Sequence, residues 1–126
     1  PKQVGALTNW SFVACSFHTV SIKTDGTLWA WGQNSNGQLG LGNTTSYSSP
    51  KQIGALTNWS SISCNTAVTT SIKTDGTLWA WGRGAFGALG LGNTTSYSSP
   101  KQVGVLTSWT KLFKSGSPQF TLAISS

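Results

Sequence analysis

A long stretch of this chain occurs twice, and this duplication limits the possible folds more than any other feature. Residues 21–32 read SIKTDGTLWAWG and recur unchanged at 71–82, and residues 39–52, LGLGNTTSYSSPKQ, recur at 89–102, in both cases 50 positions later. Such a period is typical of repeat architectures, in which each copy buries its apolar surface against the next. The chain is therefore expected to stack similar units side by side.

The centre of each copy carries a hairpin signal. Asp25-Gly26 and Asp75-Gly76 lie between alternating runs rich in Ile, Thr, Leu and Trp. A tight hairpin turn needs positive φ at its central residues, which Gly adopts without steric cost and Asp tolerates. We therefore predict positive φ at Asp25 and Asp75, which makes them turn residues.

Each unit is expected to contain four short strands and no helix. In the first unit we predict strands at 10–14, 19–24, 27–31 and 51–53, with a Gly-, Asn- and Ser-rich loop over 33–49. Within the third strand, Leu28 and Ala30 share one face and Trp29 and Trp31 the other. The second unit follows the same order from 59 to 103. A third begins at Trp109 and stops inside its second strand.

Four antiparallel strands in about fifty residues describe a blade of a β-propeller, so the predicted fold class is all-β. We expect one propeller segment of about two and a half repeats, divided into 1–4 (the end of a preceding blade), 10–53, 59–103 and 109–126 (an incomplete blade). Because open blade faces would be apolar, we expect this chain to be part of a longer polypeptide or to be covered by neighbouring chains. The paired tryptophans are predicted to fill the space between blades: Trp29, Trp31, Trp79 and Trp81.

Composition excludes two classes of protein and leaves one question open. Only 8% of the 126 residues are charged while 11% are aromatic, the opposite of a disordered tail. No apolar run is long enough for a transmembrane helix. The net charge of +6 is compatible with an anionic partner such as nucleic acid or an acidic surface. The preferred interpretation is a soluble protein whose few charges happen to be basic, because the basic residues are scattered singly with no cluster of three.

Cysteine and acidic residues do not form a recognisable site. Cys15 and Cys64 each follow a Trp by five residues, so they should point the same way in successive blades and are expected to be buried thiols. One His and two isolated Cys cannot complete a four-ligand zinc site. Asp25 and Asp75 would be the one possible carboxylate pair, but they belong to separate turns. We predict no catalytic, metal or cofactor site and no enzymatic activity.

Several motifs together resemble a known family. They are His18-Thr19, KTDGT at 23–27, WGQNSNGQLGLG at 31–42, and Pro50. This spacing resembles the repeat of the regulator of chromosome condensation family, in a version similar to bacterial and phage sequences. The resemblance implies a propeller, usually of seven blades. It also implies a range of roles, from nucleotide exchange on a small GTPase with chromatin binding to surface modules of bacteria and viruses, so the fold does not decide the function.

One departure from the family pattern concerns its histidine. The position of His18 is held by Val68 and Phe120 in the other two units. A position that accepts Val and Phe is a packing position, so we interpret His18 as a core residue rather than a catalyst.

The two copies differ sharply in one loop. Residues 33–38, QNSNGQ, become RGAFGA at 83–88. The second loop loses amide groups and gains a cation and an aromatic ring, both enriched at interfaces. Arg83 and Phe86 are therefore candidate partner-contact residues. The alternative is that Phe86 tucks under its own blade and Arg83 caps a turn.

Two functions remain open. The first is a structural or surface module, associated with a virion or a bacterial surface, that binds a protein partner or neighbouring copies. The second is a regulatory propeller that binds chromatin or a small GTPase. Near-identical repeats and sparse charge favour the first, and with it an extracellular or virion-surface location over a nuclear one.

Overall fold

Strands dominate the architecture of the computed structural model, which describes residues 3–5, 8–114 and 121–125. The first sheet contains β1 (Trp10–Cys15), β2 (His18–Lys23), β3 (Leu28–Gly32) and β4 (Tyr47–Gln52), and the second contains β5 (Trp59–Cys64), β6 (Val68–Lys73), β7 (Leu78–Gly82) and β8 (Tyr97–Gln102). Each is antiparallel in sequential order, and β9 (Trp109–Lys114) pairs with β10 (Thr121–Ser125). The predicted all-β class with four-stranded antiparallel sheets is confirmed.

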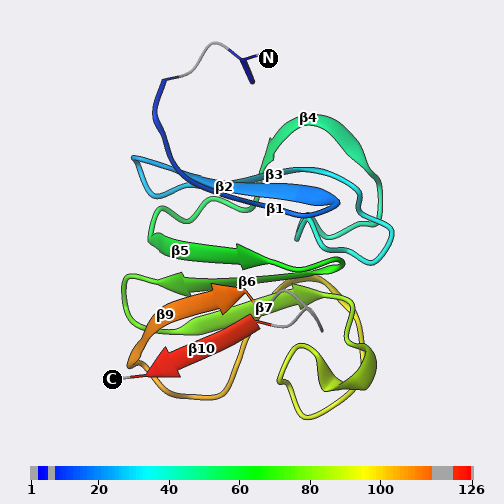
Figure 1. Ribbon diagram of the computed structural model, residues 1–126, viewed down its shortest axis with the longest axis vertical. Coiled ribbons are helices and arrows are strands. Elements are labelled where there is room, and N and C mark those ends of the chain that lie inside the picture. The colour runs from blue at the N-terminus through cyan, green and yellow to red at the C-terminus, as the bar shows by residue number, and fades with distance from the viewer. Residues whose placement is uncertain (1–2, 6–7, 115–120, 126) are drawn as a thin grey trace.

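The sheets stack face to face in chain order, as Figure 1 shows from the blue strands to the red ones. A continuous apolar core joins the first two sheets through Leu28 and Leu39 on one side and Trp59, Cys64 and Trp81 on the other. Neither sheet could bury both of its faces alone, so stacking provides the burial that the repeat pattern required. In the described residues the helical content is a single 3₁₀ turn, Ala85–Gly87.

The fourth strand begins earlier than predicted. We expected it at residue 51, but β4 starts at Tyr47, which pairs with Gly32 after an irregularity in the ladder between Ala30 and Gly32. Pro50 lies inside this strand, which is possible because β4 is at the edge of its sheet, where no neighbour needs the missing N–H. The predicted loop over 33–49 therefore ends three residues sooner, at 46.

The hairpin turns also differ from the prediction. Positive φ occurs at Gly26 and Gly76 but not at Asp25 or Asp75. Lys23 N donates to Thr27 O and Gly26 N donates to Lys23 O, which describes a three-residue loop that needs one left-handed residue rather than two. The prediction of positive φ at the aspartates was wrong, because their side chains, not their backbone angles, shape the turn.

Both ends of the chain bear on the expected blade boundaries. Gln3 and Val4 lie outside the strands, and the rest of the predicted end of a preceding blade, residues 1 and 2, lies outside the described residues. At the other end, β9 and β10 pair as the predicted beginning of a third unit. The division of the chain into blade segments stays a prediction.

Candidate interaction site

Local hydrogen bonds explain why each blade repeats the sequence DGTLW. Asp25 Oδ1 accepts hydrogen bonds from Thr27 N at 3.0 Å and Thr27 Oγ1 at 2.6 Å, and Trp29 Nε1 donates to Thr27 Oγ1 at 2.9 Å. The same relay recurs at Asp75, Thr77 and Trp79. The hydrogen bonds from Thr27 and Thr77, side chain first and then backbone, hold the pKa of each aspartate below its usual value. These carboxylates are structural acceptors in two separate turns.

The interface between the blades contains a polar network that sequence reasoning did not find. Thr69 Oγ1 donates to the main-chain oxygen of Gln38 at 2.7 Å, and Trp81 Nε1 donates to the same oxygen at 3.0 Å. His18 Nε2 lies 2.7 Å from Thr69 Oγ1. Since the hydroxyl proton of Thr69 is directed to Gln38, His18 Nε2 is the donor of this pair. His18 is buried, so its interpretation as a core residue is confirmed.

The four paired tryptophans differ in burial according to whether another blade packs against them. Trp81 is fully buried, while Trp31, its counterpart in the first blade, is half-buried. Trp29 and Trp79 are also half-buried. The expected interior position therefore holds for Trp81, which has a blade packed against it, and only partly for the other three.

The prediction of two buried thiols was half wrong. Cys64 is buried and its Sγ donates to Ala14 O of the first blade at 3.6 Å, whereas Cys15 is exposed. The two thiols occupy equivalent positions, and the difference arises because Cys64 has a blade packed against it.

The first of the two divergent loops is held together by its amides. Asn34 is buried and its Nδ2 donates to Thr45 O at 2.8 Å, while its Oδ1 accepts from Leu39 N at 2.9 Å. Gln38 Oε1 accepts from Asn36 N at 2.8 Å. The next blade covers this loop, since a methyl group on Gly37 would lie 2.6 Å from the Cα of Ser98.

The second loop replaces these amides by close backbone packing. Gly84 holds the position of Asn34, and a methyl group there would meet Thr95 O at 1.9 Å. Gly84 N still donates to Ser96 Oγ, so the base of the loop keeps its path. The chain then forms the 3₁₀ turn, in which Phe86 has φ 59° and ψ 22°.

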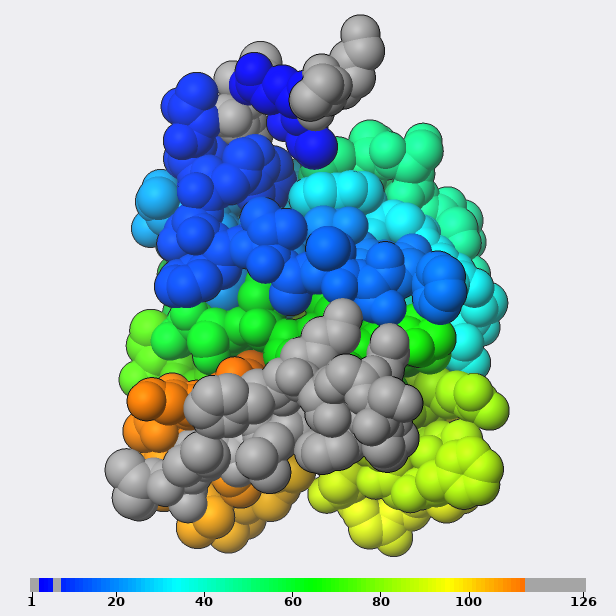
Figure 2. Space-filling model, viewed as in Figure 1, coloured from blue at the N-terminus to red at the C-terminus, as the bar shows by residue number. Residues whose placement is uncertain are grey.

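Phe86 is therefore displayed and not packed. Its side chain is 99% exposed, and Arg83 in the same loop is exposed as well. Both line a hollow of about 160 Å³ together with the turn between β5 and β6. The yellow-green segment that contains them forms a lobe at the lower right of the molecule (Figure 2). The alternative, in which Phe86 tucks under its own blade, is wrong.

In the part of the chain that the structure describes, no group of three His, Cys, Asp or Glu residues gathers closely enough to hold a metal ion. The described segments also contain no helix with the length and apolar character that a membrane span requires.

Comparison with known families and structures gives a consistent result. The model of the regulator of chromosome condensation (RCC1) repeat matches residues 25–70 and 75–124. Protein RCC2 of Homo sapiens is 46% identical over 37 residues, which is 29% of this chain and 7% of that protein, and the RCC2 homolog of Danio rerio is 47% identical over 36 residues, again 29% and 7%.

Solved structures support the same fold. Human WBSCR16 matches with a TM-score of 0.68 and 24% identity over 76% of this chain and 26% of its own. Prp20p of Saccharomyces cerevisiae, described with its binding to Gsp1p and histones, matches with a TM-score of 0.71 and 18% identity over 79% of this chain and 27% of its own. The chain thus spans about a quarter of these structures and a much smaller part of the curated relatives.

Proposed function

Because the chain belongs to the regulator of chromosome condensation repeat family, we propose that it is a non-enzymatic propeller module that binds a protein partner through the loop at 83–88. The observation that carries this proposal is Phe86, whose side chain is 99% exposed at a left-handed backbone position. Arg83 supplies a cation at the base of the same loop.

The energetics of this loop favour a binding role. Burying a Phe side chain stabilises a protein by about 1.5–3 kcal/mol. Phe86 does not contribute this free energy while its side chain stays exposed. Left-handed φ at a residue other than Gly costs a further 1–2 kcal/mol or so. A strained and exposed aromatic residue in a short turn is therefore stabilised by contact with a partner, and Phe and Arg are both residue types enriched at interfaces.

The finer assignment is to a structural or surface module, associated with a virion or a bacterial surface. Near-identical repeats and the low share of charged residues support it. The alternative is a regulatory propeller, suggested by the binding of Prp20p to Gsp1p and histones. A chain with a net charge of +6 would repel the basic histones, which favours the first assignment.

A second part of the proposal concerns the open face of the first blade. Val13 is exposed on this face, whereas Ile62, the aligned residue of the second blade, is half-buried against the core between the two blades. We propose that a further blade, from the same polypeptide or a neighbouring copy, covers this face. Sedimentation velocity tests it on the full chain. Self-association that Val13→Ser weakens supports coverage by a copy, and a stable monomer with this face open contradicts the proposal.

The loop is tested with the double variant Arg83→Gln, Phe86→Asn, since Asn tolerates the left-handed conformation. Val105→Asn is the control, because Val105 is another exposed apolar residue outside this loop. Interaction partners captured by wild type and variants are identified by mass spectrometry, and their affinities are then measured with purified proteins. We expect the double variant to lose about 1–3 kcal/mol of binding free energy at an unchanged melting temperature. Equal binding by all three proteins, or a lower melting temperature with unchanged binding, would overturn the assignment.

A small GTPase and histones are assayed directly in the same format. Binding by these two proteins that survives the loop substitutions would favour the regulatory alternative.

A further inference from the structure

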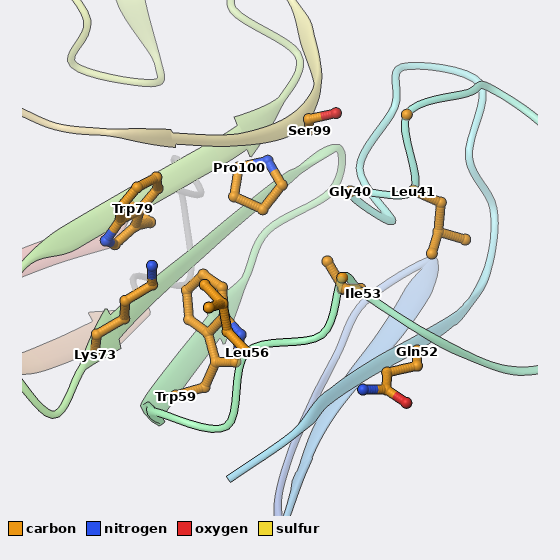
Figure 3. A pocket seen from close by; sticks show the side chains of 12 residues that line it. Gly40, Leu41, Gln52, Ile53, Leu56, Trp59, Lys73, Trp79, Ser99 and Pro100 are labelled. Atoms are coloured by element: carbon orange, nitrogen blue, oxygen red, sulfur yellow. The ribbon is translucent and has the colours of Figure 1, made fainter.

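A cavity lies between the first two blades, away from the loop at 83–88. It has a volume of about 420 Å³, which lies within the range of small-molecule sites. One wall comes from Leu41 and Ile53 of the first unit, and the other from Pro100 and Trp79 of the second (Figure 3). The chain connecting the two sheets passes beside it at Leu56.

A lysine ammonium group lies in the wall of this mainly apolar cavity, which Gln52 and Ser99 also line. Lys73 is 7% exposed, and its Nζ is 3.8 Å from the ring centroid of Trp79 and 4.8 Å from that of Trp59. Burial lowers the pKa of Lys73, against the attraction of Asp75. The Asp75 carboxylate is itself occupied by Thr77. The ammonium is thus largely removed from solvent and lies against two aromatic faces, while Asp75 attracts it electrostatically.

A second donor lines the same cavity. Trp59 is buried, and its Nε1 has no hydrogen-bond partner within the described parts of the chain. An unsatisfied buried donor carries a desolvation cost of about 1–3 kcal/mol. An acceptor placed in the cavity would recover that cost.

The first blade holds the same group of side chains, and its Lys23 is as buried as Lys73. Lys23 Nζ is 3.7 Å from the ring centroid of Trp29 and 5.0 Å from that of Trp10. The cluster of one Lys and two Trp is therefore a regular part of the blade. The second cluster differs because residues 40–42 and 52–54 of the first unit enclose it.

We propose that this cavity binds a small organic anion with a flat apolar body, such as an aromatic carboxylate or sulfonate. Its ring would lie among Leu41, Ile53 and Pro100, and its charge would face Lys73 with Trp59 Nε1 as a further donor. This site is separate from the loop at 83–88, so either proposal can fail without the other.

The test is a titration of the full chain with naphthalene-2-sulfonate, followed by calorimetry and by the shifts of methyl and indole NMR signals. Naphthalene-2-sulfonamide, which has nearly the same shape but no charge, is the matched neutral ligand. We expect saturable binding at one site, at least tenfold weaker binding of the sulfonamide, and weakening of sulfonate binding by salt.

Variants then assign the site. Lys73→Met keeps the apolar stem and should weaken sulfonate binding at least tenfold, and Trp59→Phe should weaken it several-fold. Lys23→Met, the same change in the first blade, should leave it unchanged. If Lys73→Met does not fold, nuclear Overhauser contacts between the ligand and the methyl groups of Leu41 and Ile53 in the wild type decide the question. Absence of saturable binding, equal binding of the sulfonamide, or equal effects of the two lysine variants would overturn the proposal.

Discussion

The hydroxyl of Thr69 donates a 2.7 Å hydrogen bond to the main-chain oxygen of Gln38 and so ties the second blade to the loop of the first. The two residues are 31 positions apart, and the bond is buried. The same Thr69 hydroxyl accepts a hydrogen bond from His18 Nε2, and the same Gln38 oxygen accepts a second one from Trp81 Nε1. This small network joins side chains of both sheets to one carbonyl group.

Removing the hydroxyl should therefore loosen the blade interface. Thr69→Val keeps the shape of the side chain but leaves the Gln38 carbonyl with one donor fewer and removes the hydroxyl that accepts from His18 Nε2. We expect a loss of about 1–3 kcal/mol in the free energy of unfolding, measured by urea denaturation. Thr19→Val is the matched control at the equivalent, half-buried position of the first blade. Equal losses in both variants would contradict the role of this network.

The glycine of each hairpin turn should be intolerant of any side chain. Gly76 has φ 81°, and a methyl group there would lie 1.9 Å from Thr107 O, in the connection to the next strand pair. Gly54 has φ 61° but nothing within 4 Å. Thermal unfolding should show a loss of about 1 kcal/mol for Gly54→Ala, from backbone strain alone, and a clearly larger loss for Gly76→Ala. Similar losses would mean that the close approach to Thr107 is unimportant.

Acid should destabilise the fold through the turn carboxylates. The pKa values of Asp25 and Asp75 are held below 3.8, first by the side-chain hydrogen bonds from Thr27 and Thr77. A lowered pKa in the folded state contributes stability that is present above the pKa of the unfolded chain and is lost as pH falls through that of the folded state. Stability should thus decline below about pH 4.

The double variant Asp25→Asn, Asp75→Asn isolates this effect. Its free energy of unfolding should depend less on pH between about 2 and 5 than that of the wild type, since amides do not titrate. An unchanged pH profile would show that other groups govern acid unfolding.

Thiol chemistry should distinguish the two cysteines. A maleimide or aromatic disulfide reagent should label exposed Cys15 within minutes in the native protein, while Cys64, buried against Ala14, should react only on unfolding. Mass spectrometry of tryptic peptides gives the position of the label. Cys15→Ser should abolish the fast phase, and rapid labelling of Cys64 would show that the blade interface opens readily.

The strained turn offers a stability test that is independent of any partner. Phe86→Gly removes a left-handed phenylalanine whose side chain is almost fully exposed. The melting temperature should therefore stay the same or rise, and the free energy of unfolding should increase by no more than about 1 kcal/mol. The control is Leu39→Ala in the buried core, which should cost about 2–5 kcal/mol. A marked drop in stability for Phe86→Gly would mean that the ring packs within the fold.

What the sequence determined by itself is local. The repeat of 50 residues, the alternation around the hairpins and the turn glycines were enough to predict strand order, sheet type and the stacking of similar units. The difference in sequence between the loop at 83–88 and its counterpart at 33–38 could also be recognised without the structure. These features depend on backbone geometry and on pairing between strands that are close in sequence, so pattern alone could reveal them.

Tertiary structure decided the features that depend on a neighbour. Cys15 and Cys64 occupy equivalent positions in the two repeats but differ in exposure. The first blade packs against Cys64, whereas Cys15 is exposed. Tyr47 belongs to β4 because it pairs with Gly32 of the neighbouring strand β3. The bond from Thr69 to Gln38 and the cavity beside Lys73 combine residues from two units. Identical sequences thus acquire different surroundings, and the physical reason is that burial and hydrogen bonding across the stack are set by contact in space.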